Sequence, residues 1–273
     1  MKSLHGGRGT PRACRVFECL VTIESNARAA DQSGTPAPHV EIEVWSDVAC
    51  PWCYIGKRRF ASALAAFPQR DRVAVVWRAY QLAPDTPVGA RRGELEVLVE
   101  HKGMPADQVR QMFRHVAATA AADGLVMDFD TVIAANTFDA HRLLHLAGDR
   151  QDALLEALFR AHFADGAVID DRVVLAQLAA GVGMDGDEVA AALDGDAGAD
   201  AVHADLAAAR SLGVTGVPFF VADRRLAVSG AQPQEIFTEL LRQAVEHADG
   251  ARAQDGAALD ADAEGCTDDS CAV

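Results

Sequence analysis

The first regular pattern along the chain is an alternation of apolar and charged residues that begins at Val40. Val40, Ile42 and Val44 alternate with Glu41 and Glu43. A period of two residues is typical of a strand with one buried face. The pattern therefore predicts a half-buried strand whose two glutamates lie on the face away from the core.

The residues that follow change to a helical period. Tyr54, Phe60, Leu64 and Phe67 recur at helical spacing until Pro68, and a Val- and Trp-rich run over 72–80 then predicts a second strand. Ser46 and Asp47, just before this helix, are residue types favoured at helix N-termini. Residues 39–80 are therefore predicted to form a strand, a helix and a strand.

Residues 81–195 have a helical pattern almost throughout. An apolar stripe follows Pro105, a second stripe of leucines and Phe159 precedes Gly166, and two shorter helices are predicted over 170–180 and 187–193. The strand-like style returns only after this block. We interpret residues 81–195 as an inserted helical domain.

The last ordered part is predicted over residues 196–247. It contains an Ala-rich helix over 197–212, two strands over 217–221 and 226–229, and a final helix opened by Pro233. Residues 1–38 are rich in Gly and Pro without periodicity, and residues 248–273 consist largely of Ala, Asp and Gly. We predict a disordered leader at residues 1–38 and a flexible acidic tail at residues 248–273.

Charge and hydropathy narrow the class of partner. The formal net charge is −15, which argues against binding to nucleic acid or to an anionic membrane surface. No run of eighteen apolar residues is present, and no apolar block of signal-peptide length follows the basic residues near the N-terminus. These features predict a cytoplasmic protein, acting as a monomer or homodimer. In that compartment disulfides are usually transient or catalytic.

Six cysteines fall into three pairs, and only one pair follows a predicted strand. Cys50 and Cys53 are separated by Pro51 and Trp52 at the start of the predicted helix. Helix N-termini stabilise a thiolate, and a second thiol one turn away can resolve a mixed disulfide. Pro51 fits the first helical position because its missing N–H would have no partner there. This arrangement predicts a redox-active dithiol with Cys50 as nucleophile and Cys53 as resolving thiol.

A zinc site is the main alternative for a Cys-x-x-Cys motif. Zinc would require two further ligands at close spacing, and the ordered part of the sequence offers none near the pair. His141 and His145 lie four residues apart, which is also a metal-ligand spacing, but no acidic third ligand accompanies them in a recognisable pattern. We therefore expect no metal and no resident cofactor, with glutathione as a candidate co-substrate.

Several motifs resemble one family. The stretch from Ser46 to Cys53, Ser-Asp-Val-Ala-Cys-Pro-Trp-Cys, resembles the opening of the DsbA-like thioredoxin superfamily, in particular its FrnE-like branch. Residues 215–218, Thr-Gly-Val-Pro, resemble the cis-proline loop of the superfamily, and residues 136–142 resemble a segment of that branch's helical insertion. The resemblance covers residues 40–245. It implies an α/β thioredoxin-like fold with a large all-helical insertion.

The resemblance also assigns expected roles. Pro218 would lie beside the cysteines, with Val217 and Thr215 in contact with substrate, since the backbone of Val217 can pair with an extended segment. Asn136 and His141 would line the cleft beneath the insertion. Trp52 would be partly exposed and contact substrate.

One position departs from the wider pattern. Many thioredoxin-like proteins carry a buried acid six residues before the first cysteine, where this chain has Val44. Asp47 is the nearer carboxylate, and two roles stay open for it at this point: helix cap or proton relay.

The remaining four cysteines lie at the two ends of the chain. Cys266 and Cys271 would form a second dithiol on the acidic tail that exchanges with the first pair, whereas Cys14 and Cys19 lie in the leader.

The leading hypothesis is thiol–disulfide exchange on protein or small-thiol substrates, with its direction open. A glutathione-dependent isomerase of the hydroxychromene-carboxylate type and a redox-linked chaperone or adaptor are the alternatives.

Overall fold

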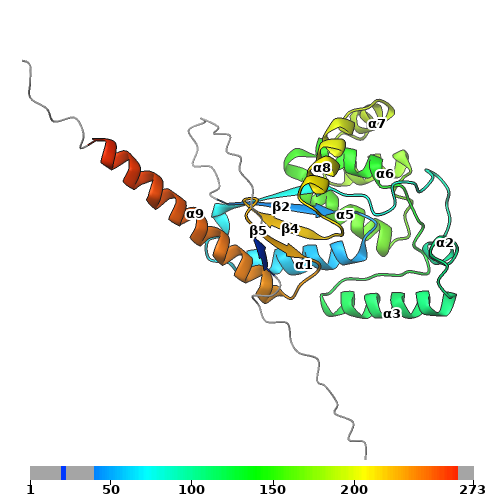
Figure 1. Ribbon diagram of the computed structural model, residues 1–273. Coiled ribbons are helices and arrows are strands. Elements are labelled where there is room, and N and C mark those ends of the chain that lie inside the picture. Colours follow the sequence, from blue (N-terminus) through cyan, green and yellow to red (C-terminus); the bar gives the residue numbers. More distant parts are fainter. Residues whose placement is uncertain (1–19, 23–39, 264–273) are drawn as a thin grey trace, which may run out of the picture.

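A computed structural model describes residues 20–22 and 40–263, which form a mixed sheet covered by helices (Figure 1). The strand order is β1-β5-β4-β2-β3. Strands β2 and β3 are parallel, and the other neighbours are antiparallel. The strands are β1 (Leu20–Thr22), β2 (Val40–Ser46), β3 (Val73–Ala79), β4 (Phe219–Ala222) and β5 (Leu226–Ser229).

Strand β2 is buried on both faces, which corrects the prediction of a half-buried strand. Only Glu41 is exposed, and Glu43 is 2% exposed. Glu43 tolerates burial because Arg78 and Arg224 both pair with its carboxylate. The alternation of apolar and acidic residues correctly predicted a strand. The second face of this strand, however, is buried around a paired charge and is not exposed to solvent.

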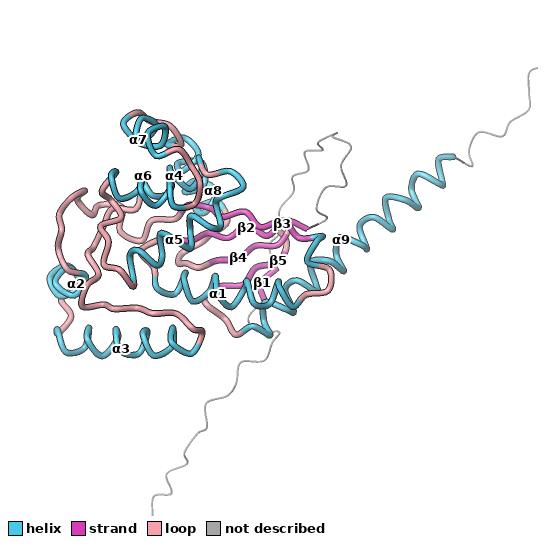
Figure 2. Tube along the Cα trace, turned by 180° about the vertical axis from the view of Figure 1, so that it is seen from behind, coloured by secondary structure: helices cyan, strands magenta, loops and turns pink. Residues whose placement is uncertain are grey.

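Helices cover both faces of the sheet. Helix α1 (Pro51–Ala66) and the first turns of α9 (Gln234–Ala263) pack together on one face, where the rings of Phe60, Phe220 and Phe237 meet at 4.6–5.6 Å. Helix α8 (Ala199–Ser211) lies along β3, over a smaller apolar cluster that contains Trp45 (Figure 2). Burial of such rings on both faces supplies much of the driving force for folding.

The chain between β3 and α8 contains six helices. Tyr54 on α1 stacks on Phe159 on α5, with ring centroids 4.8 Å apart. One continuous apolar core thus joins this helical part to the sheet. The six are α2 (Glu94–Lys102), α3 (Ala106–Ala122), α4 (Phe138–Leu146), α5 (Gln151–Phe163), α6 (Arg172–Gly181) and α7 (Gly186–Asp194).

Both ends of the chain differ from the sequence prediction. Strand β1, inside the predicted leader, pairs antiparallel with β5; three residues are too few for a period to be visible. Helix α9 continues to Ala263, so an irregular tail does not begin at residue 248. Its Ala-rich sequence has high helix propensity, and Arg72 pairs with Asp249 beyond the predicted end.

Within the described residues, no helix combines the length and apolar character needed to cross a membrane.

Candidate active site

The two central cysteines lie at the start of α1, directly after β2. Cys50 is the N-cap residue, with extended backbone angles, and Pro51 takes the first helical position. The carbonyl of Cys50 accepts hydrogen bonds from the N–H groups of Cys53 and Tyr54 at 3.0 and 3.3 Å. Both cysteines are free thiols and buried, at 4% and 1% exposure. The helix dipole therefore acts on Cys50, which is favourable for a thiolate there.

The loop before β4 lies against Cys50. The Val217–Pro218 peptide bond is cis, and the thiol of Cys50 lies 3.8 Å from the carbonyl oxygen of Val217. Gly56 on α1 faces the proline ring so closely that a Cβ atom there would lie 2.8 Å from Cγ of Pro218. Among the described residues, none accepts a hydrogen bond from the N–H of Val217. The loop thus brings a backbone carbonyl next to the sulfur of Cys50.

Cys53 has a different environment from Cys50. Burial raises its pKa well above the usual thiol value, and the neighbouring Cys50 raises it further. The backbone N–H of Asp47, 3.5 Å from Cys53 Sγ, and the Ser46 side chain act in the opposite direction. Cys53 is consequently a protonated thiol at neutral pH.

Asp47 does not cap α1, which answers one of the two roles left open by the sequence. Its carboxylate accepts hydrogen bonds from the N–H groups of Ala49 at 3.3 Å and Leu82 at 2.7 Å, and no side chain caps the helix. The carboxylate is buried behind the cysteines and lies 3.5 Å from Nε2 of His141. Two backbone donors stabilise its negative charge in this apolar setting.

His141 is buried rather than exposed in a cleft. It is 2% exposed, and despite its distance to Asp47 its Nε2 atom lacks a hydrogen bond of acceptable geometry. The expectation that His141 lines an open cleft is therefore wrong, whereas its contact with substrate stays a prediction. His145, one turn later on α4, pairs with Asp205 at 2.7 Å instead. The two histidines face different carboxylates and do not share a ligand position.

Two further titratable groups face Asp47, and sequence reasoning missed both. Burial lowers the pKa of His162 on α5 to about 4, against the pull of Asp47. Burial also raises the pKa of Glu94 on α2, and the charge of Asp47 adds to this rise. Neither residue stands in a motif. For His162, its place in the apolar stripe of α5 was the one available signal.

The other predicted substrate residues have mixed positions. Asn136 uses its side-chain amide within the protein, donating to the carbonyls of Pro84 and Thr86 and accepting from Phe138 N–H. It fixes the loop after β3, although it also borders a cavity of about 460 Å³. Trp52 is half-buried with its ring 6.5 Å from His115 on α3, and Thr215 is exposed in the proline loop.

The other four cysteines, Cys14, Cys19, Cys266 and Cys271, lie outside the described residues. In the part of the chain that the structure describes, no three His, Cys, Asp or Glu side chains are grouped to hold a metal ion.

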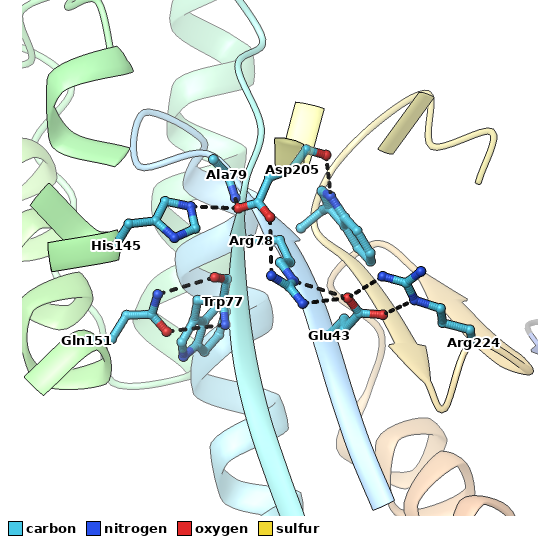
Figure 3. A network of polar contacts seen from close by, with 9 residues as sticks. Glu43, Trp77, Arg78, Ala79, His145, Gln151, Asp205 and Arg224 are labelled. Atoms are coloured by element: carbon cyan, nitrogen blue, oxygen red, sulfur yellow. Dashed lines mark hydrogen bonds and ion pairs between the residues drawn. The ribbon is translucent and has the colours of Figure 1, made fainter. Parts of the chain in front are cut away.

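A second buried polar cluster lies on the other face of β2 (Figure 3). Arg78 on β3 bridges two carboxylates, pairing with Glu43 at 2.9 Å and with Asp205 at 3.3 Å. Asp205 on α8 also accepts from the N–H of Ala79 at 2.8 Å and lies 2.7 Å from His145. Arg224, at the turn after β4, completes the pairing of Glu43. Every carboxylate oxygen in this cluster has a partner.

A mixed sheet, a two-thiol helix start, a facing cis-proline loop and a helical insertion together define a thioredoxin-fold thiol protein. Residues 41–242 match the model of the DSBA-like thioredoxin domain, and the chain belongs to this family. The family is in general one of thiol–disulfide oxidoreductases. No curated protein matches the chain.

Solved structures agree with this assignment. A probable DsbA oxidoreductase from Streptomyces coelicolor is 47% identical, with a TM-score of 0.73 over 76% of this chain and 91% of that one. The cytosolic disulfide reductase DsbM from Pseudomonas aeruginosa, solved with GSH, is 22% identical (TM-score 0.53, 74% and 98% covered). A 2-hydroxychromene-2-carboxylate isomerase is 17% identical (TM-score 0.53, 80% and 98% covered). The last two show a shared fold.

Proposed function

We propose that this protein exchanges disulfides through Cys50 and Cys53. The observation that carries the proposal is the pairing of two unlike thiols: Cys50 at the N-terminus of α1 beside the proline loop, and Cys53 buried and protonated behind it. A helix N-terminus favours the nucleophile, and a nearby protonated thiol is suited to resolution. Residues 46–53 also support placement in the FrnE-like branch.

The reaction balances as two thiol exchanges. The thiolate of Cys50 attacks one sulfur of the substrate disulfide, the substrate S–S bond breaks, and one substrate thiolate leaves. Cys53 then loses its proton and attacks Sγ of Cys50, forming the Cys50–Cys53 disulfide and releasing the second substrate thiol. Two electrons have passed to the substrate. A thiol reductant such as glutathione would return them, and the same steps in reverse would oxidise a dithiol substrate.

The proline loop supplies the substrate contacts in this proposal. The N–H of Val217 has no acceptor among the described residues, so it is suited to pair with an extended segment that carries the disulfide, whether in a protein or in a small peptide thiol. The carbonyl of the same residue lies beside Cys50. Pro218 holds the loop against α1, and Trp52 and Thr215 border the same opening.

The test is an insulin-reduction assay with glutathione as reductant. Cys50→Ser is expected to lose at least about 10³-fold in rate, because the reaction has no other nucleophile. Cys53→Ser should instead form a stable mixed disulfide, visible by mass spectrometry. Retained turnover in Cys50→Ser would overturn the proposal. Glutathione-dependent isomerisation of an aromatic substrate that survives Cys53→Ser would favour the isomerase instead.

The tail pair enters as a separate proposal. Cys266 and Cys271 would exchange electrons with Cys50 and Cys53, so Cys266→Ser with Cys271→Ser should slow re-reduction without altering the first attack. Measuring the potential of the Cys50–Cys53 pair against glutathione, with and without these substitutions, tests the exchange and establishes the direction of the enzyme. Identical turnover in both proteins would dismiss the exchange.

A further inference from the structure

Two buried polar atoms behind Cys53 have no hydrogen-bond partner. They are Oγ of Ser46, at the end of β2, and Nε2 of His141, on α4; each residue is 2% exposed. Burial of an unpaired polar group is costly, and such groups usually have a partner or a function. Both residues line one small cavity.

That cavity has a volume of about 10 Å³ and is lined by Ser46, Trp77, Arg78, Ala79, His141, Leu144, His145, Gln151 and Leu155. A volume of roughly 10–15 Å³ with several polar walls is what one internal water molecule needs. The hydroxyl, imidazole and amide groups on its walls are suitable partners for such a water.

Two residues that line the cavity connect it to Cys53 and to Asp47. Ser46 lies close enough to Cys53 to oppose the rise of its pKa. His141 Nε2 lies 3.5 Å from Oδ1 of Asp47, and the backbone N–H of Asp47 reaches Cys53 Sγ. A chain of proton-carrying groups thus starts at Cys53 and ends at a histidine beside a negative charge.

We propose that the proton of Cys53 passes through the Ser46 hydroxyl and one water molecule in this cavity to His141. The inference rests on the proposed function. In the step, the Cys53 S–H bond breaks, the sulfur keeps the electron pair and attacks Sγ of Cys50, and a substrate thiolate leaves. The proton ends on the imidazole of His141, and the Asp47 carboxylate balances the charge of the imidazolium. His141 acts through Ser46 and does not touch the reacting sulfurs.

The other charged groups around His141 are less suited to accept the proton. His162 has a pKa of about 4 and is a weak base. His145 and Arg78 are held by Asp205, and Lys57 on α1 pairs with Asp152 and Glu156. Glu94 faces Asp47 from α2, and burial together with the charge of Asp47 raises its pKa.

The experiment separates attack from resolution in single turnovers. The full chain is used with Cys14, Cys19, Cys266 and Cys271 replaced by serine. The probe is an aromatic disulfide whose released thiolate absorbs visible light. The first equivalent released reports attack by Cys50, and the second reports resolution by Cys53. A Cys53→Ser protein releases one equivalent and identifies the first phase.

His141→Gln is expected to slow the second phase by roughly 10²-fold at neutral pH, the scale of lost proton-transfer catalysis, with the first phase unchanged. The rate of its second phase should then rise about tenfold per pH unit, since hydroxide has become the proton acceptor. The second phase of the original protein should depend less steeply on pH. Ser46→Ala leaves α4 intact and should slow the second phase several-fold. His203→Gln changes an exposed histidine on α8 that does not line the cavity, so it is the control and should leave both phases unchanged.

Three results would overturn the proton route. They are equal slowing of both phases in His141→Gln, an unchanged pH profile of its second phase, and the same selective slowing in His203→Gln. Should His141→Gln fail to fold, an unchanged second phase in Ser46→Ala has the same force. A missing first phase in the original protein would instead contradict the proposed function itself.

Discussion

The two faces of strand β2 carry buried polar clusters that differ in one respect. On the α8 face, Glu43 and Asp205 are fully paired by Arg78, Arg224, His145 and backbone donors (Figure 3). On the face toward the cysteines, Ser46, His141 and His162 each retain an unpaired polar atom. A satisfied network rigidifies a core, whereas unpaired buried groups cost stability. The difference agrees with the proposal that the first cluster holds the fold and the second serves the chemistry.

The largest effect is expected from breaking the paired cluster. In the original protein, the groups around Asp205 donate hydrogen bonds to its carboxylate. Asp205→Asn turns an amide N–H₂, itself a donor, toward these donors. The free energy of unfolding should therefore fall by about 3 kcal/mol, as for other broken buried pairs. Urea denaturation followed by tryptophan fluorescence measures this. The second phase of the single-turnover assay should keep its rate below the transition. A slowed resolution step in this variant would end the division between the two clusters.

The sequence predicts the parts of these clusters whose residues lie close together along the chain, and it does not predict contacts between residues far apart in the sequence. Strand β2, the start of α1 and the Val217–Pro218 loop follow from local patterns and from a resemblance that covers residues 40–245. The pairing of Glu43 depends on Arg224, which is 181 residues away. An alternating pattern places Glu43 on a face of the strand, but it contains no information on what covers that face.

The same limit applies to the candidate site. Cys50 and Cys53 stand in a short motif, and the position of Asp47 beside them was visible. The burial of His141 and its approach to Asp47 depend on how α4 packs against the β2–α1 loop, and His162 comes from yet another helix. The end of α9 was missed for a different reason: composition alone suggested irregular structure, whereas alanine also favours a long helix.

A second effect, almost as large, concerns the pH dependence of stability. His162 has its folded-state pKa lowered to about 4 by burial, below the unfolded value of about 6.5. The unfolded state therefore binds more protons between these values. The stabilisation is fully present above pH ~6.5 and is lost as the pH falls toward 4, by on the order of 3 kcal/mol.

His162→Gln should remove this part of the acid sensitivity. Urea titrations at several pH values between about 4 and 7 would show a flatter curve than for the original protein. Asp205→Asn is the comparison, since it leaves His162 in place. An unchanged slope in His162→Gln would mean that His162 is not buried in its neutral form.

A third, smaller effect is expected from Asp47→Asn. The amide oxygen can still accept the N–H of Leu82, so the loop is retained, but the charge beside His141 is lost. We expect resolution by Cys53 to slow about tenfold, equivalent to about 1.4 kcal/mol. The first phase of the assay should not change. Loss of both phases together would indicate a disturbed helix start instead.

The smallest effect is expected from Ser46→Ala. It separates the two clusters most clearly, because the free energy of unfolding should not fall as it does in Asp205→Asn. Ser46→Ala removes a buried hydroxyl that has no protein partner, so the free energy of unfolding should stay within about 1 kcal/mol of the original value or rise. Resolution should nevertheless slow several-fold. Urea denaturation and the second phase of the single-turnover assay, measured on one protein preparation, check both. Replacing a residue that is kept for chemistry at a cost in stability leaves the stability unchanged or raises it. A loss of stability as large as in Asp205→Asn would therefore show that Ser46 also holds the fold.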